Sequence, residues 1–251
     1  MLAQRRYDMI LEQVHLKKTV TVKELAQQLH VTEVTIRRDL ETLDKKKMLK
    51  RVHGGAKELG TTSILSPTNE TRMLDRLSVH YNQKLHVCQK AATYLHDGDC
   101  IFLDGGTSIL PLLQCIEHLQ IKIVTNNVLI EHAFEGGKAE LIGLGGTEIP
   151  EYKMIVGPWA QRMLSSFNFD YAFIGSAGFD VENNLLYTAE SETLAIKEIA
   201  IAQSSQTFLL TDSSKASVKG FCSYSMTDKI DRVICDKGLQ VDDLPENYIL
   251  V

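Results

Sequence analysis

The chain has 251 residues, 44% of them hydrophobic, which is enough for a small module and one larger domain with an apolar core. No stretch has the apolar length of a membrane span, and the five cysteines form no CxxC pair and no metal-ligand spacing, so we expect a cytoplasmic protein with no membrane segment and no metal site. Residues 1–57 carry 13 Lys and Arg against 7 Asp and Glu, whereas the remaining residues carry 14 against 25, which indicates a polyanion partner for the first part only.

The first elements are predicted to be helices. Residues from about 3 to 15 have apolar side chains at helical spacing, which predicts a first helix. The short β-branched run 19–22 interrupts it. Thr21 and Glu24 then have the spacing of a capping box, with a hydroxyl followed three residues later by a carboxylate, and predict the start of a second, brief helix through Leu29.

A third helix is predicted after Thr32, whose hydroxyl can cap it. Ile36, Leu40 and Leu43 repeat at spacings of four and three residues and define its buried stripe. Two short helices joined by a tight turn indicate a helix-turn-helix. The first turn and the opposite face carry the residues of this helix that we expect to contact DNA in the major groove: Thr32, Val34, Thr35, Arg37, Arg38 and Lys45.

A wing is predicted next. Residues 48–52 alternate as a strand does, and Gly54-Gly55 permits a tight turn. A wing would place Lys50, Arg51, His53 and Gly54 beside the phosphate backbone. A solvated charged face on an ordinary surface helix is the commoner explanation for one basic helix, but the turn before this helix and the wing after it favour DNA binding.

The second half alternates strands and helices after a polar connector at 58–78. A helix is expected from about residue 79 to 95, and later helices near residues 112–119, 129–134, after 157–158, and at 192–202. The apolar runs between them are CIFLD, IKIVT, AELIGL, DYAFIG, QTFLLTD and DRVICD. This alternation predicts an α/β fold with a mostly parallel, Rossmann-like sheet covered on both faces.

Polar residues follow several predicted strands, where ligands of such sheets bind. Asp104 to Ser108 read DGGTS and suit a phosphate, because glycines let the backbone approach a ligand and because hydroxyls and amides at a helix start donate to it. The competing interpretation is an ordinary strand-to-helix turn in which Asp104 accepts backbone donors. Asn126 follows the next strand, Lys215 follows a later one, and Lys197 lies on the helix before it.

None of the remaining motifs matches a cofactor-binding pattern. Gly143 to Gly146 lack the last glycine of a dinucleotide fingerprint, and the chain has no Gly-Lys-Ser/Thr phosphate loop. The histidines of the second half show no metal-ligand pairing. We therefore expect no metal, no cofactor and no catalytic residues.

The motifs TIRRDL at 35–40 and RVHGGA at 51–56 resemble the N-terminal half of DeoR-family transcriptional regulators. DGGTS, VTNN, DYAFIGSAGFD and TDSSK resemble the sensor domain of the same family. The resemblance implies a sensor similar to ribose-5-phosphate isomerase-type folds and a phosphorylated sugar as effector. It places these residues in the effector site: Asp104, Gly105, Gly106, Thr107, Ser108, Asn126, Lys197 and Lys215. Lys153 is added as a candidate from the loop described next.

The loop from Glu148 to Val156 departs from the family pattern. Where the family often has arginines and a serine, this chain reads TEIPEYKMIV, with Met154 in the place of the serine. The contacts that Lys153 or Tyr152 make from this loop are therefore left open, and the loop is a candidate for effector selection.

The resulting hypothesis is a transcriptional repressor of sugar-metabolism genes that binds double-stranded operator DNA as a homodimer or homotetramer, with a sugar phosphate altering its operator affinity. We expect a winged helix-turn-helix at 1–57, a linker at 58–78, and a sensor and oligomerisation domain at 79–251. One alternative is a sugar-phosphate isomerase with a DNA-binding arm, in which Asp104 or Glu192 acts as general base. Another is an interaction module whose basic arm binds RNA or an acidic protein.

Overall fold

A computed structural model describes residues 3–46, 48–58, 64–66, 70, 73–216, 218–226, 229–241 and 243–251. The chain divides into two compact units: an N-terminal unit of residues 1–63 and 75–80, and a C-terminal unit of residues 64–74 and 81–251. Much of the connector expected at 58–78, namely 59–63, 67–69 and 71–72, lies outside the described residues.

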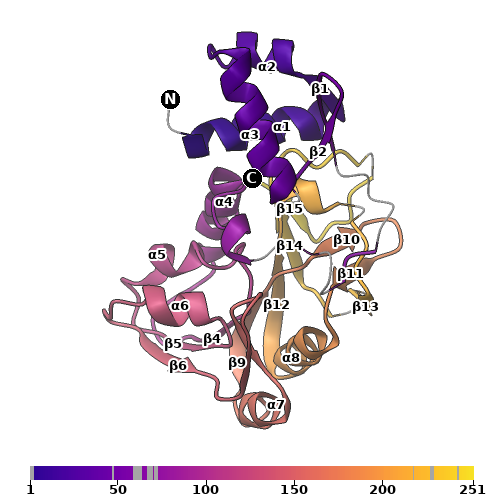
Figure 1. The fold of residues 1–251 in the computed structure, drawn as a ribbon. Helices are drawn as coiled ribbons and strands as arrows, with labels where there is room; N and C mark the ends of the chain where they lie inside the picture. Colours follow the sequence, from indigo (N-terminus) through magenta and orange to yellow (C-terminus); the bar gives the residue numbers. More distant parts are fainter. Residues whose placement is uncertain are drawn as a thin grey trace. The chain divides into compact units, whose positions relative to one another are not determined.

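The N-terminal unit is a winged helix-turn-helix (Figure 1). Its three strands pair antiparallel in the order β1-β3-β2. The β-branched run 19–22, which was expected only to interrupt two helices, therefore contributes a strand, β1, to the wing sheet. Its elements are α1 (Ala3–Lys17), β1 (Thr19–Thr21), α2 (Val22–Gln28), α3 (Glu33–Lys45), β2 (Lys50–Val52) and β3 (Gly55–Lys57).

Both predicted helix caps are formed. The Thr21 hydroxyl accepts from the Glu24 N–H at 3.2 Å, and the Glu24 carboxylate accepts from the Thr21 N–H at 3.0 Å, which is the complete capping box. The hydrogen bond from the Thr21 N–H is the largest cause that lowers the pKa of Glu24. Thr32 caps α3 by accepting from the Thr35 N–H at 3.2 Å. These local bonds fix the residues at which α2 and α3 begin.

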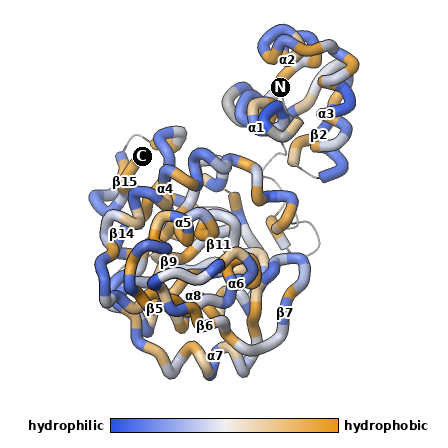
Figure 2. The backbone as a smooth tube through the Cα atoms, turned by 90° about the vertical axis from the view of Figure 1, so that its left-hand side faces the viewer, coloured by the Kyte–Doolittle hydropathy of each residue, from blue (hydrophilic) through white to orange (hydrophobic). Residues whose placement is uncertain are grey.

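The stripe of α3 is buried as predicted. Ile36, Leu40 and Leu43 are each at most 1% exposed and pack with Ile10 of α1 and Leu25 of α2 in one apolar cluster. Hydrophobic and hydrophilic stretches alternate along α2 and α3 in Figure 2, as an amphipathic helix requires. Burying the stripe orients the opposite face of α3 outward.

The C-terminal unit is built on a seven-stranded parallel sheet in the order β15-β14-β12-β9-β4-β5-β6. The sheet strands are β4 (Cys100–Leu103), β5 (Lys122–Thr125), β6 (Glu140–Gly143), β9 (Phe169–Ile174), β12 (Ser204–Leu210), β14 (Arg232–Cys235) and β15 (Tyr248–Leu250). The helices are α4 (Tyr81–Ala92), α5 (Leu112–Ile116), α6 (Val128–Ala133), α7 (Pro158–Leu164) and α8 (Ser191–Ala202). Short 3-10 helices lie at η1 (Met73–Arg76) and η2 (Ser213–Lys215).

Helices cover both faces of this sheet, which confirms the predicted fold class (Figure 1). Side chains of α4, α5 and α6 form one apolar cluster, and side chains of α7 and α8 form a second. Successive strand residues contribute to opposite clusters: Ile101 and Leu103 belong to the first and Phe102 to the second. The carboxyl ends of the parallel strands therefore share one edge.

Several short strands were not foreseen from the sequence. They form a hairpin of β7 (Thr147–Ile149) and β8 (Met154–Val156) and a separate antiparallel sheet of β10 (Gly178–Asp180), β11 (Leu185–Thr188) and β13 (Cys222–Ser225). The helix expected near residues 112–119 begins at Leu112 as α5 but ends at Ile116, so the DGGTS run does not lie at a helix start. The Leu112 N–H bonds to the Ile109 carbonyl and the Leu113 N–H to the Leu110 carbonyl, so three-residue turns occupy the chain between loop and helix.

Candidate functional site

The outward face of α3 carries the side chains expected to read DNA. Val34 is 57% exposed, Arg37, Arg38 and Lys45 are exposed, and Thr35 is half-buried. Arg37 pairs with Glu33 at 2.7 Å, an exposed contact one helical turn away and therefore weak. Within the described part of the chain, the Arg38 guanidinium has no ion-pair partner and is available for a base edge or a phosphate.

Asp39 of the TIRRDL motif lies on the buried side of α3 instead. Its carboxylate accepts two hydrogen bonds from Arg6 of α1, from Nε at 2.5 Å and from Nη2 at 3.0 Å, and this pairing raises the pKa of Arg6. Such a fork fixes α3 against α1. The sequence analysis assigned Asp39 no role, although an acid three residues after Ile36 in an apolar stripe is a signal for a buried partner.

The wing presents its predicted residues to the surface. Lys50, Arg51, His53 and Gly54 are exposed, and Gly54 makes the turn with a φ of 79°. The Arg51 N–H donates to the Asp44 carboxylate at 2.9 Å, which ties β2 to the end of α3. Helix face and wing are thus held together as one surface.

The ligand-site candidates of the C-terminal unit gather where the parallel strands end. Asp104 follows β4, Asn126 follows β5, Ser176 follows β9 and Thr211 follows β12, and all four are at least nine-tenths buried. Each of these four side chains has a buried oxygen without a hydrogen-bond partner in the described structure. Buried polar atoms are rarely left unpaired, so these oxygens mark places for ligand or water donors.

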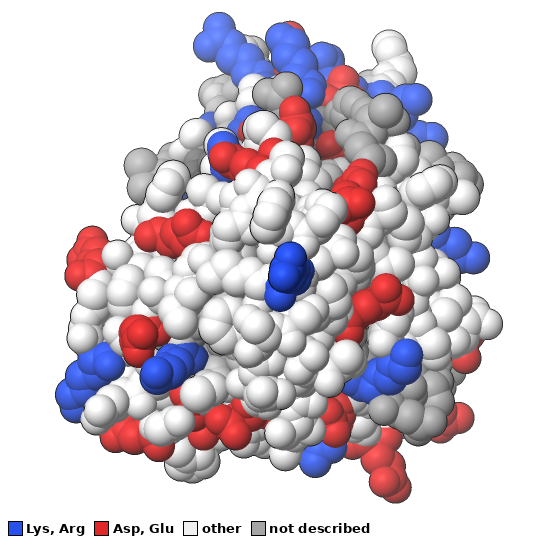
Figure 3. All heavy atoms as spheres, turned by 90° about the horizontal axis from the view of Figure 1, so that it is seen from below, with Lys and Arg blue, Asp and Glu red and all other residues white. Residues whose placement is uncertain are grey.

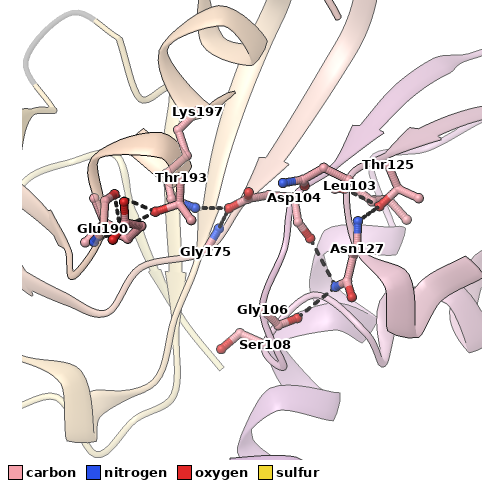
Figure 4. A network of polar contacts seen from close by, with 12 residues as sticks. Leu103, Asp104, Gly106, Ser108, Thr125, Asn127, Gly175, Glu190, Thr193 and Lys197 are labelled. Atoms are coloured by element: carbon pink, nitrogen blue, oxygen red, sulfur yellow. Dashed lines mark hydrogen bonds and ion pairs between the residues drawn. The ribbon is translucent and has the colours of Figure 1, made fainter. Parts of the chain in front are cut away.

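Asp104 is the centre of a polar network (Figure 4). Its Oδ2 accepts from the Gly175 N–H at 2.9 Å and forms a buried ion pair with the Lys197 ammonium. Asn127 donates to the main-chain carbonyls of Asp104 at 3.3 Å and Gly106 at 3.2 Å, so it holds the DGGTS loop in place. The structure confirms that Asp104 and Lys197 come together across 93 residues of sequence.

Two lysines approach the hydroxyls of the same loop. The Lys84 ammonium donates to Thr107 Oγ1 at 2.9 Å, and the Lys215 ammonium donates to Ser108 Oγ at 2.8 Å. Asp212 is 4.0 Å from Lys215. Two ammonium groups on adjacent hydroxyls, beside a glycine pair, make a place suited to an anion.

Lys84 was missed by the sequence analysis. It is 4% exposed on α4, on the same face as the buried residues Val87, Cys88 and Ala91. A lysine in the apolar stripe of a helix is a detectable signal, because a charged residue is almost never fully buried without a partner.

The β7–β8 hairpin covers the loop. A side chain on Gly105 would come within 2.4 Å of the Met154 sulfur, so Met154 packs directly on that glycine. The Ile155 N–H donates to the Asn126 carbonyl at 2.8 Å, and Asn126 Nδ2 donates to the Ile155 carbonyl at 3.2 Å. Lys153, expected at the effector, instead pairs with Glu148 of the same hairpin at 2.9 Å.

Among the described residues, no group of three His, Cys, Asp or Glu side chains is arranged to hold a metal ion. Within the described ranges, no helix combines the length and apolar character needed to cross a membrane.

Comparison with known proteins gives the family. The model of the DeoR-like helix-turn-helix domain matches residues 6–62, and that of the DeoR C-terminal sensor domain matches residues 79–237. The HTH-type transcriptional regulator YulB of Bacillus subtilis is 32% identical over 95% of this chain and 91% of its own length. The lactose phosphotransferase system repressor of Staphylococcus epidermidis is 29% identical over 98% of this chain and 97% of its own length.

Solved structures similar to this chain include ribose 5-phosphate isomerase A from Methanocaldococcus jannaschii, with a TM-score of 0.42, 15% identity and coverage of 55% of each chain. The family matches together span both units and agree with the winged helix-turn-helix and the parallel sheet. The chain therefore belongs to the DeoR family of helix-turn-helix transcriptional regulators.

Proposed function

We propose that this protein is a repressor of sugar-metabolism genes whose affinity for operator DNA changes when a phosphorylated sugar binds the C-terminal unit. The observation that carries the proposal is the pair of ammonium groups, Lys84 and Lys215, on the hydroxyls of Thr107 and Ser108. The names of several relatives, lactose phosphotransferase system repressors, support a sugar-linked role.

The DNA-binding surface is assigned to α3 and the wing. Arg38, with no intramolecular ion pair among the described residues, is proposed to contact a base, and Lys50 and Arg51 of the wing are proposed to contact phosphates. Across the middle and lower part of the face in Figure 3, acidic and basic side chains are interspersed with uncharged ones. Such a mixed surface offers no continuous basic track for DNA.

The ligand is proposed to lie with its phosphate at Thr107 and Ser108 and its hydroxyls toward Asp104 and Asn126. The two lysines supply the charge that a phosphate needs, while the unpartnered oxygens of Asp104 and Asn126 can accept from sugar hydroxyls. Lys153 is left out of this assignment, because its ammonium already pairs with Glu148.

We propose a homodimer or homotetramer, since operators with two-fold symmetry match two-fold proteins. A repressor that acts on chromosomal DNA would work in the cytoplasm. The chain is proposed not to be an enzyme. The isomerase alternative needs Asp104 or Glu192 as a general base, but the Gly175 N–H and the Lys197 ammonium already bind Oδ2 of Asp104, which leaves only its Oδ1 for that role.

Calorimetry of the purified protein tests the ligand site. Glucose 6-phosphate, fructose 6-phosphate and fructose 1-phosphate are titrated against the unphosphorylated sugars, which are expected not to bind. Lys215→Met should weaken the binding of the preferred phosphate at least about 10-fold, since it removes a charge-assisted hydrogen bond. Lys122→Met, an exposed lysine on β5, is the control. Equal binding to the variant and the control would remove Lys215 from the site.

A further inference from the structure

A six-residue part of the chain, Asp75–His80, belongs to the N-terminal unit although the residues on both sides of it belong to the C-terminal unit. We call it the returning segment. Within the N-terminal unit, the Asp75 carboxylate pairs at 3.4 Å with Lys46, the C-terminal cap of α3, and Val79 packs against the apolar cluster that contains Ile36 and Leu40. The returning segment is thus attached to the DNA-reading helix.

The chain just before the returning segment is anchored on the hairpin that covers the ligand site. The Met73 N–H donates to the carbonyl of Glu151 at 3.0 Å, and the Met73 side chain is fully buried in the C-terminal unit. Glu151 lies in the turn between β7 and β8, three residues before Met154, which packs on Gly105. The hairpin and Met73 are therefore joined directly by a main-chain hydrogen bond.

A second anchor lies at the start of the same stretch. The Leu65 N–H donates to the Lys219 carbonyl at 2.8 Å, and the Phe221 N–H donates to the Leu65 carbonyl at 2.7 Å. Lys219 and Phe221 lie a few positions after Lys215 in the chain. Leu65 is thus held by the loop that continues from Lys215, and Met73 by the hairpin that covers the DGGTS loop.

The chain just after the returning segment leads into α4. His80 has a φ of 54°, a left-handed conformation that costs a non-glycine residue free energy, and α4 begins at the next residue, Tyr81. Lys84, on the first turn of α4, is the lysine that holds Thr107. The downstream end of the returning segment is therefore covalently continuous with α4, while its upstream end is linked to the hairpin by the hydrogen bond of Met73.

We propose that the returning segment couples the ligand site to α3: a ligand that draws in Lys84 or moves the hairpin shifts both ends of the segment, and Asp75 and Val79 pass that shift to α3. This inference rests on the proposed function, because it needs a ligand at that site. The ligand changes operator affinity only by its preference for one arrangement of the segment over the other. Coupling is expected to fail when either end is loosened, even if both binding sites are intact.

Met73→Ala loosens the upstream end. The coupling factor is measured as the ratio of operator Kd with and without saturating glucose 6-phosphate, fructose 6-phosphate or fructose 1-phosphate, and each sugar-phosphate Kd is measured by calorimetry. We expect the coupling factor to fall at least about 3-fold while operator Kd without ligand is unchanged. Met226→Ala, which truncates the same buried side chain elsewhere in the C-terminal unit, is the control and should keep the factor.

His80→Gly loosens the downstream end without removing any buried side chain. Glycine adopts a positive φ freely, so the variant should fold, and the coupling factor should again fall at least about 3-fold. Asn184→Gly is the control, because Asn184 also has a positive φ, 53°, and lies in the turn between β10 and β11.

The outcomes separate the two proposals. A wild-type protein whose operator affinity none of the three phosphates changes overturns the proposed function and the coupling with it. A responsive wild type with equally responsive Met73→Ala and His80→Gly variants overturns the coupling role alone. Loss of sugar-phosphate affinity in parallel with the coupling factor also overturns it, because the residues would then only shape the ligand site.

Discussion

Arg38 differs from the other basic residues of α3 in its surroundings. Arg37 and Lys45 each pair with a glutamate one turn away, whereas Arg38 has no such partner among the described residues. Arg38→Ala should weaken operator binding by about 1–3 kcal/mol if the guanidinium reads a base. Fluorescence anisotropy on operator DNA measures this, with Lys122→Ala as a control for net charge. An unchanged operator Kd would refute the assignment.

Lys197 has a structural consequence beyond ligand binding. Both Lys197 and Asp104 are buried, so Lys197→Met leaves a carboxylate without its counter-ion and should lower the free energy of unfolding by about 3–5 kcal/mol. The double variant Asp104→Asn/Lys197→Met should recover most of that loss, and neither variant should respond to a sugar phosphate. Urea unfolding gives the comparison; a single variant as stable as the wild type would contradict the ion pair.

Site residues were predictable from sequence where a motif carried them. Asp104, Ser108 and Lys215 follow strands in recognisable polar runs, and the structure brings them together with Lys197. Lys84 escaped prediction because its partner Thr107 is 23 residues away and no local pattern joins them. The role predicted for Lys153 stays a prediction, and no sequence signal indicated that its ammonium pairs with Glu148, five residues earlier.

Among the secondary-structure elements, the wing turn depends on two adjacent glycines for different reasons. Gly54 has a φ of 79° with open space around it, whereas a side chain on Gly55 would come within 2.0 Å of the Val20 carbonyl oxygen. Gly54→Ala should cost about 1–2 kcal/mol of backbone strain. Gly55→Ala should destabilise the N-terminal unit more, because β1 must separate from β3. Thermal unfolding of both variants tests the order; the reverse order would be inconsistent with this packing.

Helices with strong local signals were predicted well, and short strands were not. The caps at Thr21 and Thr32 and the stripe on α3 are local features, and each was confirmed. Strand β1 has three residues and pairs with β3, 36 residues away in sequence, so its β-branched run did not reveal that it joins the wing sheet. The β7–β8 hairpin pairs locally, but each of its strands has only three residues and both lie in a run that departs from the family pattern.

At the scale of the whole molecule, the basic and acidic parts of the chain coincide with the parts proposed to bind DNA and a small ligand. The basic residues gather in the first 57 residues, which include α3 and the wing, while the acidic remainder contains the parallel sheet and its polar strand ends. Composition alone indicated this division, but not that the chain passes between the units at three points, after residues 63, 74 and 80. The proposed coupling uses the second and third of these passages, which bound the returning segment.

The most direct test of a sugar-phosphate-responsive repressor is operator affinity in the presence of effectors. Purified protein is titrated onto labelled DNA from upstream of its own gene, and anisotropy is recorded with each member of a panel of hexose and pentose phosphates. We expect one phosphate to change the operator Kd by about 5- to 150-fold, while its unphosphorylated sugar leaves it unchanged. Tight, sequence-specific binding that no sugar phosphate alters would contradict the proposed sensor function.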